Sequence, residues 1–598
     1  MTTRRFPWVK LLMLWIALSV CLTYFYWQMA ITLNFDDPDD FLRLQQVRDY
    51  MGGQSWFDLT QRRIAPPGGL PMHWSRLVDM PILAFLLPLK SIFGQHSAEI
   101  AAVIGAPLLT LLALVIAVVA MTRRLMGPDV ATSLLACVLT MSAPLIFLQI
   151  HPARIDHHGW QIAFAAAAVA ALMQRNARLS GIGAGMALAL YLNISIEGAP
   201  FVAATLGVVG LLWVFNRESG VRLSSALWAL LATTLLSSLL TVPFYRWTEG
   251  LCDAVMPSHM VAMAIAAGGT AMVVRFGAAR GVAGRFILLS GVLVLTLAVF
   301  GMAAPTCLGS PFGTLDPVIN TFWYQNVGEG MPVWRQDVVT AASMIGFPLL
   351  AGVGTVIGFL RASSPEMRRR WTIILVLLIV TLVTGTMVRR AAGITHVIAV
   401  PGALVLIGIV VAYAQKNFTV LLRALSTAIS IFVVSPIMPI FAVASFVPPP
   451  KIAPTSSGLP NTCKQLCALH KLAARSPETI LTGIDLGPMV IATTPHSVYS
   501  AGYHRMQEPL RDTILFFMGS PEEGRMLMRA KGLRTILIAP GSGDTALFLQ
   551  RAPGGMMARL IKGPVPSWLV EEDLGSPTLR LFRVRDVRDD LQLNPSPR

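Results

Sequence analysis

The chain has 598 residues, of which 54% are hydrophobic and only 13% are charged. This composition excludes an ordinary soluble protein and indicates a protein that crosses a membrane many times. The formal net charge of +16 would suggest nucleic-acid binding in a soluble protein. Here much of the excess lies in short loops, as the positive-inside rule describes for membrane proteins. We therefore expect the lipid bilayer, and no nucleic acid, as a partner.

Apolar segments recur along the chain as far as residue 446. A helix needs about 20 apolar residues to cross a bilayer, and about thirteen segments are candidates. The expected spans are 11–33, 100–121, 130–150, 160–174, 180–196, 199–215, 224–243, 255–274, 286–304, 337–360, 371–388, 394–414 and 418–446. The segment 80–93 is apolar but short and contains Pro81 and Pro88, which predicts a helix lying at the membrane surface.

The charges at the N-terminus set the expected orientation. Arg4, Arg5 and Lys10 precede the first apolar segment. A signal peptide begins in the same way, but the apolar run is long and no clear cleavage site follows it. We therefore interpret it as an uncleaved helix with a cytoplasmic N-terminus in a bacterial inner membrane. Counting spans from there places Arg389 and Arg390 on the outer face, where a basic pair is a candidate for phosphate binding.

Two domains are expected. Residues 1–446 form a transmembrane domain that includes the outer loops 34–99 and 305–336, and residues 447–598 form a periplasmic α/β domain. Alternating and β-branched patterns predict strands and a helix in this tail. The expected strands are 479–484, 533–539 and 579–584, and the expected helix is 521–530. The predicted fold class is thus a polytopic α-helical membrane protein with a C-terminal extracytoplasmic α/β domain.

The six cysteines fall into two groups. Cys21 and Cys137 lie in expected spans, where cysteine serves as an apolar filler. The other four lie in expected outer segments, where an oxidising periplasm favours disulfides; they are Cys252, Cys307, Cys463 and Cys467. The pairing is open, and Cys252 with Cys307 is suggested on the expectation that their two outer loops are close in space.

Carboxylates gather in the expected outer segments. Asp36, Asp37, Asp39 and Asp40 follow directly after the first span. Charges are costly near a bilayer, so this cluster suggests metal binding or proton abstraction; the alternative is a solvated turn that caps a helix. Mg²⁺ or Mn²⁺ would suit carboxylate oxygens, and a carboxylate that does not bind the metal could act as a base. Further candidates in other outer loops are Asp156, His157, His158, Glu197, Glu249, Asp253, Asp316 and Glu329.

The motif Asp156-His157-His158 leaves two other interpretations open. Its residues could be polar anchors at the membrane interface. A zinc site built from the two adjacent histidines is also possible, although neighbouring side chains rarely point at one metal. Arg154, two residues earlier, would either bind phosphate or balance the acids.

At this point the sequence resembles the C-type (GT-C) glycosyltransferases, in which a first span leads to an acidic motif and a long outer loop. Asp36–Leu44, followed by Gly53–Asp58 and Pro66–Trp74, resembles the first outer loop of bacterial and archaeal oligosaccharyltransferase catalytic subunits. That family also has about thirteen spans, a second acidic motif after the third span, a long outer loop after the ninth and an extracytoplasmic C-terminal domain. All four features are expected here.

The resemblance and the residue types in the outer segments together predict roles for particular residues. Asp36 or Asp37 would activate the acceptor, and a metal would be bound by Asp37, Asp156, His157 and Glu329, with Asp316 as an alternative to Glu329. The donor phosphate would be bound by Arg154, Arg389 and Arg390. The acceptor would be contacted by Asp39, Glu197, Asp485 and His504.

The tail departs from the family at one motif. The segment Ile480–Gly487 stands where the family has Trp-Trp-Asp, and Gly483 and Ile484 take the places of the two tryptophans while Asp485 persists. In the family those tryptophans help to recognise the hydroxyl residue of an asparagine sequon. Their absence argues against N-glycosylation of protein and for a different acceptor.

We therefore expect a metal-assisted membrane glycosyltransferase. Its donor would be a polyprenyl-(pyro)phosphate-linked sugar, and its acceptor a glycan, a lipid or a protein on the periplasmic face. The alternatives are a transporter or flippase of lipids or glycans, and a non-catalytic glycolipid-binding protein. Transporters usually place polar residues at the membrane midplane, whereas here the charged residues gather at one face.

Overall fold

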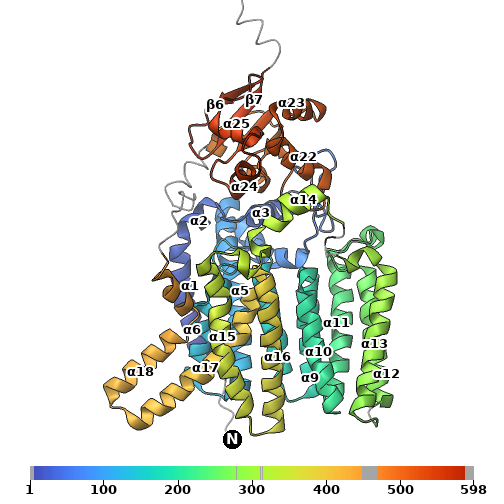
Figure 1. Cartoon of the computed structure of the whole chain (residues 1–598), viewed down its shortest axis with the longest axis vertical. Helices are drawn as coiled ribbons and strands as arrows, with labels where there is room; N and C mark the ends of the chain where they lie inside the picture. The colour runs from blue at the N-terminus through green and yellow to red at the C-terminus, as the bar shows by residue number, and fades with distance from the viewer. Residues whose placement is uncertain (1–5, 278, 310–311, 313, 448–467, 586–598) are drawn as a thin grey trace, which may run out of the picture. The chain divides into compact units, whose positions relative to one another are not determined.

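The computed structural model describes residues 6–277, 279–309, 312, 314–447 and 468–585 (Figure 1). Packing divides the chain into two compact units. The first, which we call the helical unit, takes its described residues from 1–27, 74–314 and 327–449. The second, which we call the sheet unit, takes them from 28–73, 315–326 and 450–598. The sequence-based domain boundary near residue 447 stays a prediction.

The helical unit is a multi-pass membrane bundle. Its described residues include ten helices that are long and apolar enough to cross a membrane. They are α1 (Trp8–Phe25), α5 (Gln95–Met126), α9 (Ala177–Ile194), α10 (Ala199–Phe215), α11 (Ser219–Thr241), α12 (Pro257–Gly277), α13 (Val282–Ala303), α15 (Val338–Leu360), α16 (Pro365–Met387) and α17 (Ala392–Asn417). The polytopic helical fold is therefore confirmed, and α15, α16 and α17 pack against one another (Figure 1).

The remaining expected spans are helical but interrupted or short. The segment 130–150 divides into α6 (Val130–Met141) and α7 (Pro144–Phe147), because a proline is well placed in the first turn of a helix but cannot continue one. The last span is the pair α18 (Val420–Val433) and α19 (Met438–Ala444), bent by 78°. Taken as one span, this pair raises the described total to eleven. The expected helix at 80–93 is α4 (Asp79–Phe93).

Arginines from other helices satisfy the C-terminal end of helix α8 (His158–Leu172). The last carbonyl groups of a helix lack partners within it and carry partial negative charge. Arg124 Nη1 donates to Ala170 O at 2.5 Å, and Arg369 Nη1 donates to Leu172 O at 2.8 Å. These contacts fix one end of α8, and its other end begins at the acidic motif described below.

A disulfide joins Cys252 to Cys307, with the two Cα atoms 5.1 Å apart. It links the loop before α12 to the turn η4 (Pro305–Leu308), and it confirms the suggested pairing. Cys137 is buried, as expected for an apolar filler, whereas Cys21 is exposed on α1. The expected partners Cys463 and Cys467 lie outside the described residues.

The sheet unit contains a five-stranded sheet in the order β4-β3-β5-β7-β6. The strands are β3 (Thr479–Thr482), β4 (Ser497–Val498), β5 (Thr535–Ile538), β6 (Leu569–Glu572) and β7 (Arg580–Val584). Strand β3 runs parallel to β4 and β5, and β7 is antiparallel to β5 and β6. The three predicted strands are confirmed as β3, β5 and β7, and the predicted helix is α23 (Pro521–Ala530). The other elements were not predicted, namely β4, β6, α21 (Gly487–Thr493), α22 (Gln507–Met518), α24 (Gly543–Arg551) and α25 (Met556–Lys562).

Part of the expected first outer loop belongs to the sheet unit. Helix α3 (Pro38–Met51) packs on α21. Arg48 Nη1 donates to Ala492 O at 2.7 Å, and Arg63 donates to Ile491 O at 2.5 Å and to Thr494 O at 2.7 Å. These arginines cap the C-terminal end of α21 and so hold the acidic segment before α3 and the tail motif around Asp485 in one body.

Candidate functional site

Carboxylates from three segments meet in the sheet unit. Asp37 is the N-cap of α3, where its Oδ1 accepts a hydrogen bond from Asp39 N at 2.9 Å. Asp39 Oδ1 in turn accepts from the hydroxyl of Tyr503 at 2.9 Å. Asp544 Oδ2 accepts from the backbone N–H of Ile484 at 2.6 Å, next to Asp485. We call Asp37, Asp39, Asp485 and Asp544 the carboxylate cluster.

The cluster shifts the titration of its own members. Loss of hydration beside the surrounding protein, followed by the negative charges of Asp544, Asp37 and Asp39, raises the pKa of Asp485 to about 7. The residue nevertheless keeps solvent-exposed surface. Burial, followed by the charge and hydrogen bond of Asp39, raises the pKa of Tyr503 well above its ordinary value. Tyr503 therefore stays protonated as a donor, while Asp485 exchanges its proton near neutral pH.

The structure gives a reason why no tryptophan stands at position 483. A Cβ atom added to Gly483 would lie 2.7 Å from Asp544 Oδ2, too close for any side chain unless the carboxylate moves. The next residue, Ile484, is 2% exposed and belongs to the core of the sheet unit. Of the two positions that carry tryptophan in the resembled family, one is therefore a glycine here, and the other is an isoleucine buried in the core.

A second group of ionisable residues begins helix α8 in the helical unit. One possible ligand atom each from Asp156, His157 and His158 lies within 4.8 Å of the others. Asp156 Oδ1 accepts from the backbone N–H of His158 at 2.8 Å, and the two imidazole rings have centroids 4.2 Å apart. The two adjacent histidines thus lie close together where the chain enters α8, and their binding of one metal stays a prediction.

Glu329 and Arg154 complete this group, which we call the histidine cluster. His158 Nε2 lies 3.3 Å from Glu329 Oε2, and Arg154 Nη2 lies 2.7 Å from Asp156 Oδ2. Burial raises the pKa of Glu329, but the hydrogen bond and charge of His158 and the charge of Arg154 outweigh it and lower that pKa well below its ordinary value. Of the two alternatives for the loop carboxylate, Glu329 contacts His158, whereas Asp316 is the N-cap of α14 (Pro317–Phe322) in the sheet unit.

Two of the three basic residues expected to hold a phosphate, Arg154 and Arg390, are paired with acids. Arg154 contacts Asp156 and, at 3.4 Å, Glu329. Arg390 Nη2 contacts Glu197 Oε1 at 2.7 Å, so Glu197, expected to contact the acceptor, is a partner of a cation in the helical unit. Arg389 belongs to the same turn, η8 (Arg389–Ala391). A phosphate that binds Arg154 or Arg390 therefore competes with the carboxylates that these residues contact.

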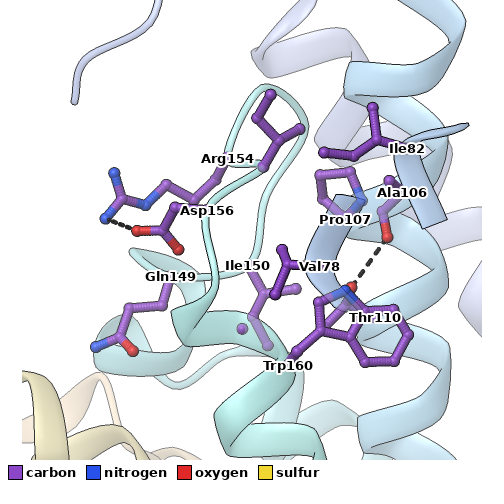
Figure 2. Close-up of a pocket in the computed structure, with 12 residues that line it drawn as sticks. Val78, Ile82, Ala106, Pro107, Thr110, Gln149, Ile150, Arg154, Asp156 and Trp160 are labelled. Carbon is purple, nitrogen blue, oxygen red and sulfur yellow. Dashed lines mark hydrogen bonds and ion pairs between the residues drawn. The ribbon is translucent and has the colours of Figure 1, made fainter. Parts of the chain in front are cut away.

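A small cavity adjoins the histidine cluster (Figure 2). Its volume of about 10 Å³ gives room for about one water molecule. Figure 2 shows Arg154 and Asp156 joined at one end, with Val78, Pro107 and Trp160 forming an apolar wall. This wall restricts the access of solvent to Asp156 from that side.

The other expected residues are placed as follows. His504 is buried, and its ring centroid lies 4.9 Å from that of His73 in the sheet unit. Asp36 is exposed just before α3. His158 was among the candidates predicted from the sequence, but the ligand role was predicted for His157. No sequence signal showed that His158 begins a helix and contacts Glu329.

Taken together, the bundle and the sheet unit have the fold of the C-type glycosyltransferases. No family model matches the chain, and no curated protein matches its sequence. Among solved structures, the likeness is to the oligosaccharyltransferase AglB from Archaeoglobus fulgidus. The complex of AglB with an inhibitory peptide and a dolichol-phosphate is 13% identical, with 99% of this chain and 76% of that chain covered at a TM-score of 0.64.

Two further structures of the archaeal oligosaccharyltransferase agree with this likeness. The apo form is 14% identical and the complex with Zn and sulfate is 12% identical, each with 91% of this chain covered and a TM-score of 0.61. They are covered over 71% and 70% of their own length. The resemblance seen in the sequence is thus confirmed at the level of the fold.

Proposed function

We propose that this protein transfers a sugar from a polyprenyl-(pyro)phosphate-linked donor to an acceptor, with the help of a divalent metal ion. The observation that carries the proposal is the convergence of Asp156, His157 and His158 within 4.8 Å, beside Glu329. The fold likeness to AglB supports it, since that protein was solved with a dolichol-phosphate and, separately, with Zn and sulfate.

The donor set narrows the choice of metal. Mg²⁺ prefers oxygen ligands alone, whereas Mn²⁺ and Zn²⁺ also bind imidazole nitrogen. Two imidazoles and a carboxylate therefore favour Mn²⁺ or Zn²⁺ over the Mg²⁺ included in the sequence-based expectation. The metal would neutralise the charge that develops on the leaving phosphate. Asp37, expected to share this metal, belongs to the other unit, and that sharing stays a prediction.

The transfer exchanges one bond for another at the anomeric carbon of the donor sugar. An acceptor oxygen or nitrogen forms a bond to this carbon, the bond from the carbon to the phosphate oxygen breaks, and its electron pair leaves with the polyprenyl (pyro)phosphate. The proton of the acceptor passes to a carboxylate, for which Asp36 and Asp37 are our candidates. Arg389 would bind the phosphate together with Arg154 and Arg390, once the latter two are released by Asp156, Glu329 and Glu197.

Localisation and orientation complete the proposal. We place the protein in the inner membrane of a bacterium, with its N-terminus in the cytoplasm. Residues 447–598 then form a domain on the periplasmic face, where a lipid-linked donor and its acceptor would meet.

The proposal is tested by following labelled sugar from a pool of polyprenyl-linked donors in membranes. Asp156→Asn removes a metal ligand and is expected to lower transfer by at least about 100-fold, and EDTA should do the same reversibly. Asp337→Asn is the matched control, because Asp337 is a helix N-cap of α15 outside the cluster. Full transfer by Asp156→Asn in the presence of EDTA would overturn the proposal.

A further inference from the structure

A proline lies inside α5, beside the loop that leads into the histidine cluster. Pro107 is buried in this helix and lines the small cavity next to Arg154 and Asp156 (Figure 2). Proline has no backbone N–H, so it cannot donate the hydrogen bond that residue 107 of a helix would give to the carbonyl group four residues earlier. The carbonyl oxygen of Val103 therefore lacks this partner within α5.

The loop supplies a donor in its place. Ala153 N donates to Val103 O at 2.8 Å. The exposed fraction is 1% for Ala153 and 0% for Val103, and a polar backbone group left unpaired at such a depth would be costly. The bond therefore ties α5 to the loop just before Arg154 and Asp156.

The backbone of Ala153 shows that the loop is held in a particular conformation here. Its φ angle is +74°, in the left-handed region that residues with a Cβ atom rarely adopt. Such a conformation persists only where the surrounding structure determines it, and it is frequent at functional sites. Ala153 adopts it where the chain donates to α5 and turns back, so that Arg154 N donates to His151 O at 2.9 Å.

The same loop is held on another side by α8. Gly159 is the second residue of that helix, and a Cβ atom added there would lie 3.0 Å from Gln149 O and 3.0 Å from Ile150 Cγ1. The loop thus packs on α8 where that helix has no side chain. Both attachments precede Arg154 and Asp156, so they fix the direction from which these two side chains reach the rest of the histidine cluster.

We propose that Pro107 is a positioning residue of the histidine cluster. Because it brings no N–H group to Val103 O, this carbonyl is reserved for Ala153, and the loop presents Asp156 to His158 and Arg154 to Glu329. The inference rests on the proposed function where it concerns the metal. It goes beyond that function by naming a residue outside the cluster on which the geometry of the cluster depends.

Pro107→Ala tests the inference by returning the missing N–H group. Alanine is the most favourable residue in a helix interior, so the bundle should stay folded, while the new N–H competes with that of Ala153 for Val103 O. Pro401→Ala is the matched control, because Pro401 is a buried proline inside α17. Within the described residues, no loop N–H donates to Val397 O, the carbonyl that Pro401 leaves without a helical donor.

The first measurement is amide hydrogen exchange of the full chain in nanodiscs, which requires neither metal nor substrate. We expect exchange in the segment 150–157 to be about tenfold faster in Pro107→Ala than in the wild type, because the loop opens more often when its bond to α5 is contested. Pro401→Ala should leave exchange in this segment unchanged. Equal exchange in the wild type and Pro107→Ala would overturn the proposal.

The second measurement is a titration with Mn²⁺ alone, followed by electron paramagnetic resonance. Loss of the support behind a metal ligand typically weakens binding by about 10–100-fold, and we expect the Kd to rise about tenfold in Pro107→Ala and to stay unchanged in Pro401→Ala. An unchanged Kd in Pro107→Ala would contradict the positioning role. If the wild type binds no Mn²⁺, the proposed function fails, whereas hydrogen exchange still decides whether Pro107 holds the loop.

Replacement of Ala153 by the corresponding α-hydroxy acid removes the donor alone. This change exchanges the backbone N–H for an ester oxygen and adds no side-chain atom. It should reproduce both effects of Pro107→Ala, and combining the two changes should produce no further loss, because both act on the same hydrogen bond. Additive effects in the combined variant would show that Pro107 acts by another route and would contradict the proposal.

Discussion

The carboxylate cluster of the sheet unit and the histidine cluster of the helical unit place their acidic side chains next to charged neighbours of opposite sign, negative in the first and positive in the second. In the first, Asp485 has other carboxylates as its charged neighbours, and its pKa is raised to about 7. In the second, Glu329 has Arg154 and His158 as neighbours, and its pKa is lowered. The first environment suits a group that takes up and releases protons, and the second suits a carboxylate that keeps its charge.

This comparison assigns different tasks to residues that the sequence presents as one set of acids. A carboxylate of low pKa keeps the negative charge that attracts a cation. Burial acts to lower the pKa of His158, but Asp156 and Glu329 raise it to about 10, so this residue must release its proton before its imidazole can bind a metal. A carboxylate that titrates near neutral pH can accept hydrogen bonds from hydroxyl groups and exchange protons with them. We therefore connect the histidine cluster with the metal and the carboxylate cluster with the acceptor.

After Asp156→Asn, the largest expected effect comes from the charge of Glu329. Glu329→Gln keeps the size of the side chain but removes the charge that faces His158 and Arg154, and we expect transfer to fall by about 10–100-fold. Asp316→Asn, the other candidate of the same loop, should retain transfer because Asp316 caps α14. Both variants are compared by label transfer at equal expression. A larger loss in Asp316→Asn than in Glu329→Gln would show that Glu329 is not the loop carboxylate that supports transfer.

A second prediction concerns the close approach at position 483. Gly483→Ala places a methyl group against Asp544 and is expected to lower the free energy of unfolding by about 1–3 kcal/mol. Adding Asp544→Ala should recover part of this loss by making room, although it also removes the acceptor of the Ile484 N–H bond. Denaturant unfolding of the two variants and of Asp544→Ala alone gives the coupling between the sites. Additive effects would refute the steric explanation.

A third prediction addresses the hydrogen bond that Tyr503 donates to Asp39. Tyr503→Phe removes a donor to a charged group and should cost about 1.5 kcal/mol of stability. The matched control is Tyr499→Phe, which removes a similar bond from Tyr499 to Asp512 outside the cluster. Both should be destabilised, but only Tyr503→Phe should alter the pH profile of transfer, because only Tyr503 contacts the carboxylate cluster. Identical profiles for the two variants would disconnect the cluster from catalysis.

A fourth prediction is a pH dependence of stability. Asp485 has an ordinary pKa of 3.8 and a folded value of about 7, so between about pH 4 and pH 7 the folded state binds the additional proton. Stability from this group is thus present at low pH and is lost as the pH rises through that window. Asp485→Asn should flatten this loss, as measured by thermal unfolding at pH 5 and pH 8. An unchanged slope would mean that Asp485 is not crowded by the other carboxylates.

Local patterns in the sequence predicted much of the fold. The apolar segments became helices, three strands and α23 of the tail were placed within two residues of their observed ends, and Cys252 was paired with Cys307. The fold could be anticipated because hydrophobic periodicity and turn residues act over short stretches of chain. Helix α8 lies within two residues of the expected segment 160–174, whereas the break before Pro144 was missed.

The candidate site was predicted less completely. Asp37, Asp39 and Asp485 were chosen from motifs, and the sheet unit brings them together. The pairing of Glu197 with Arg390 and the contact of His158 with Glu329 were not foreseen. These contacts join residues far apart in the chain, and such partners follow from packing rather than from any local pattern.

The most direct test of this account is Mn²⁺ binding to the purified full-length protein, followed by electron paramagnetic resonance. We expect one tight site with nitrogen coupling from imidazole. It should be lost in Asp156→Asn and in the double variant His157→Ala/His158→Ala, but retained in Asp485→Asn. A site that survives loss of the histidines and disappears in Asp485→Asn would assign the metal to the carboxylate cluster and contradict the division of tasks between the two clusters.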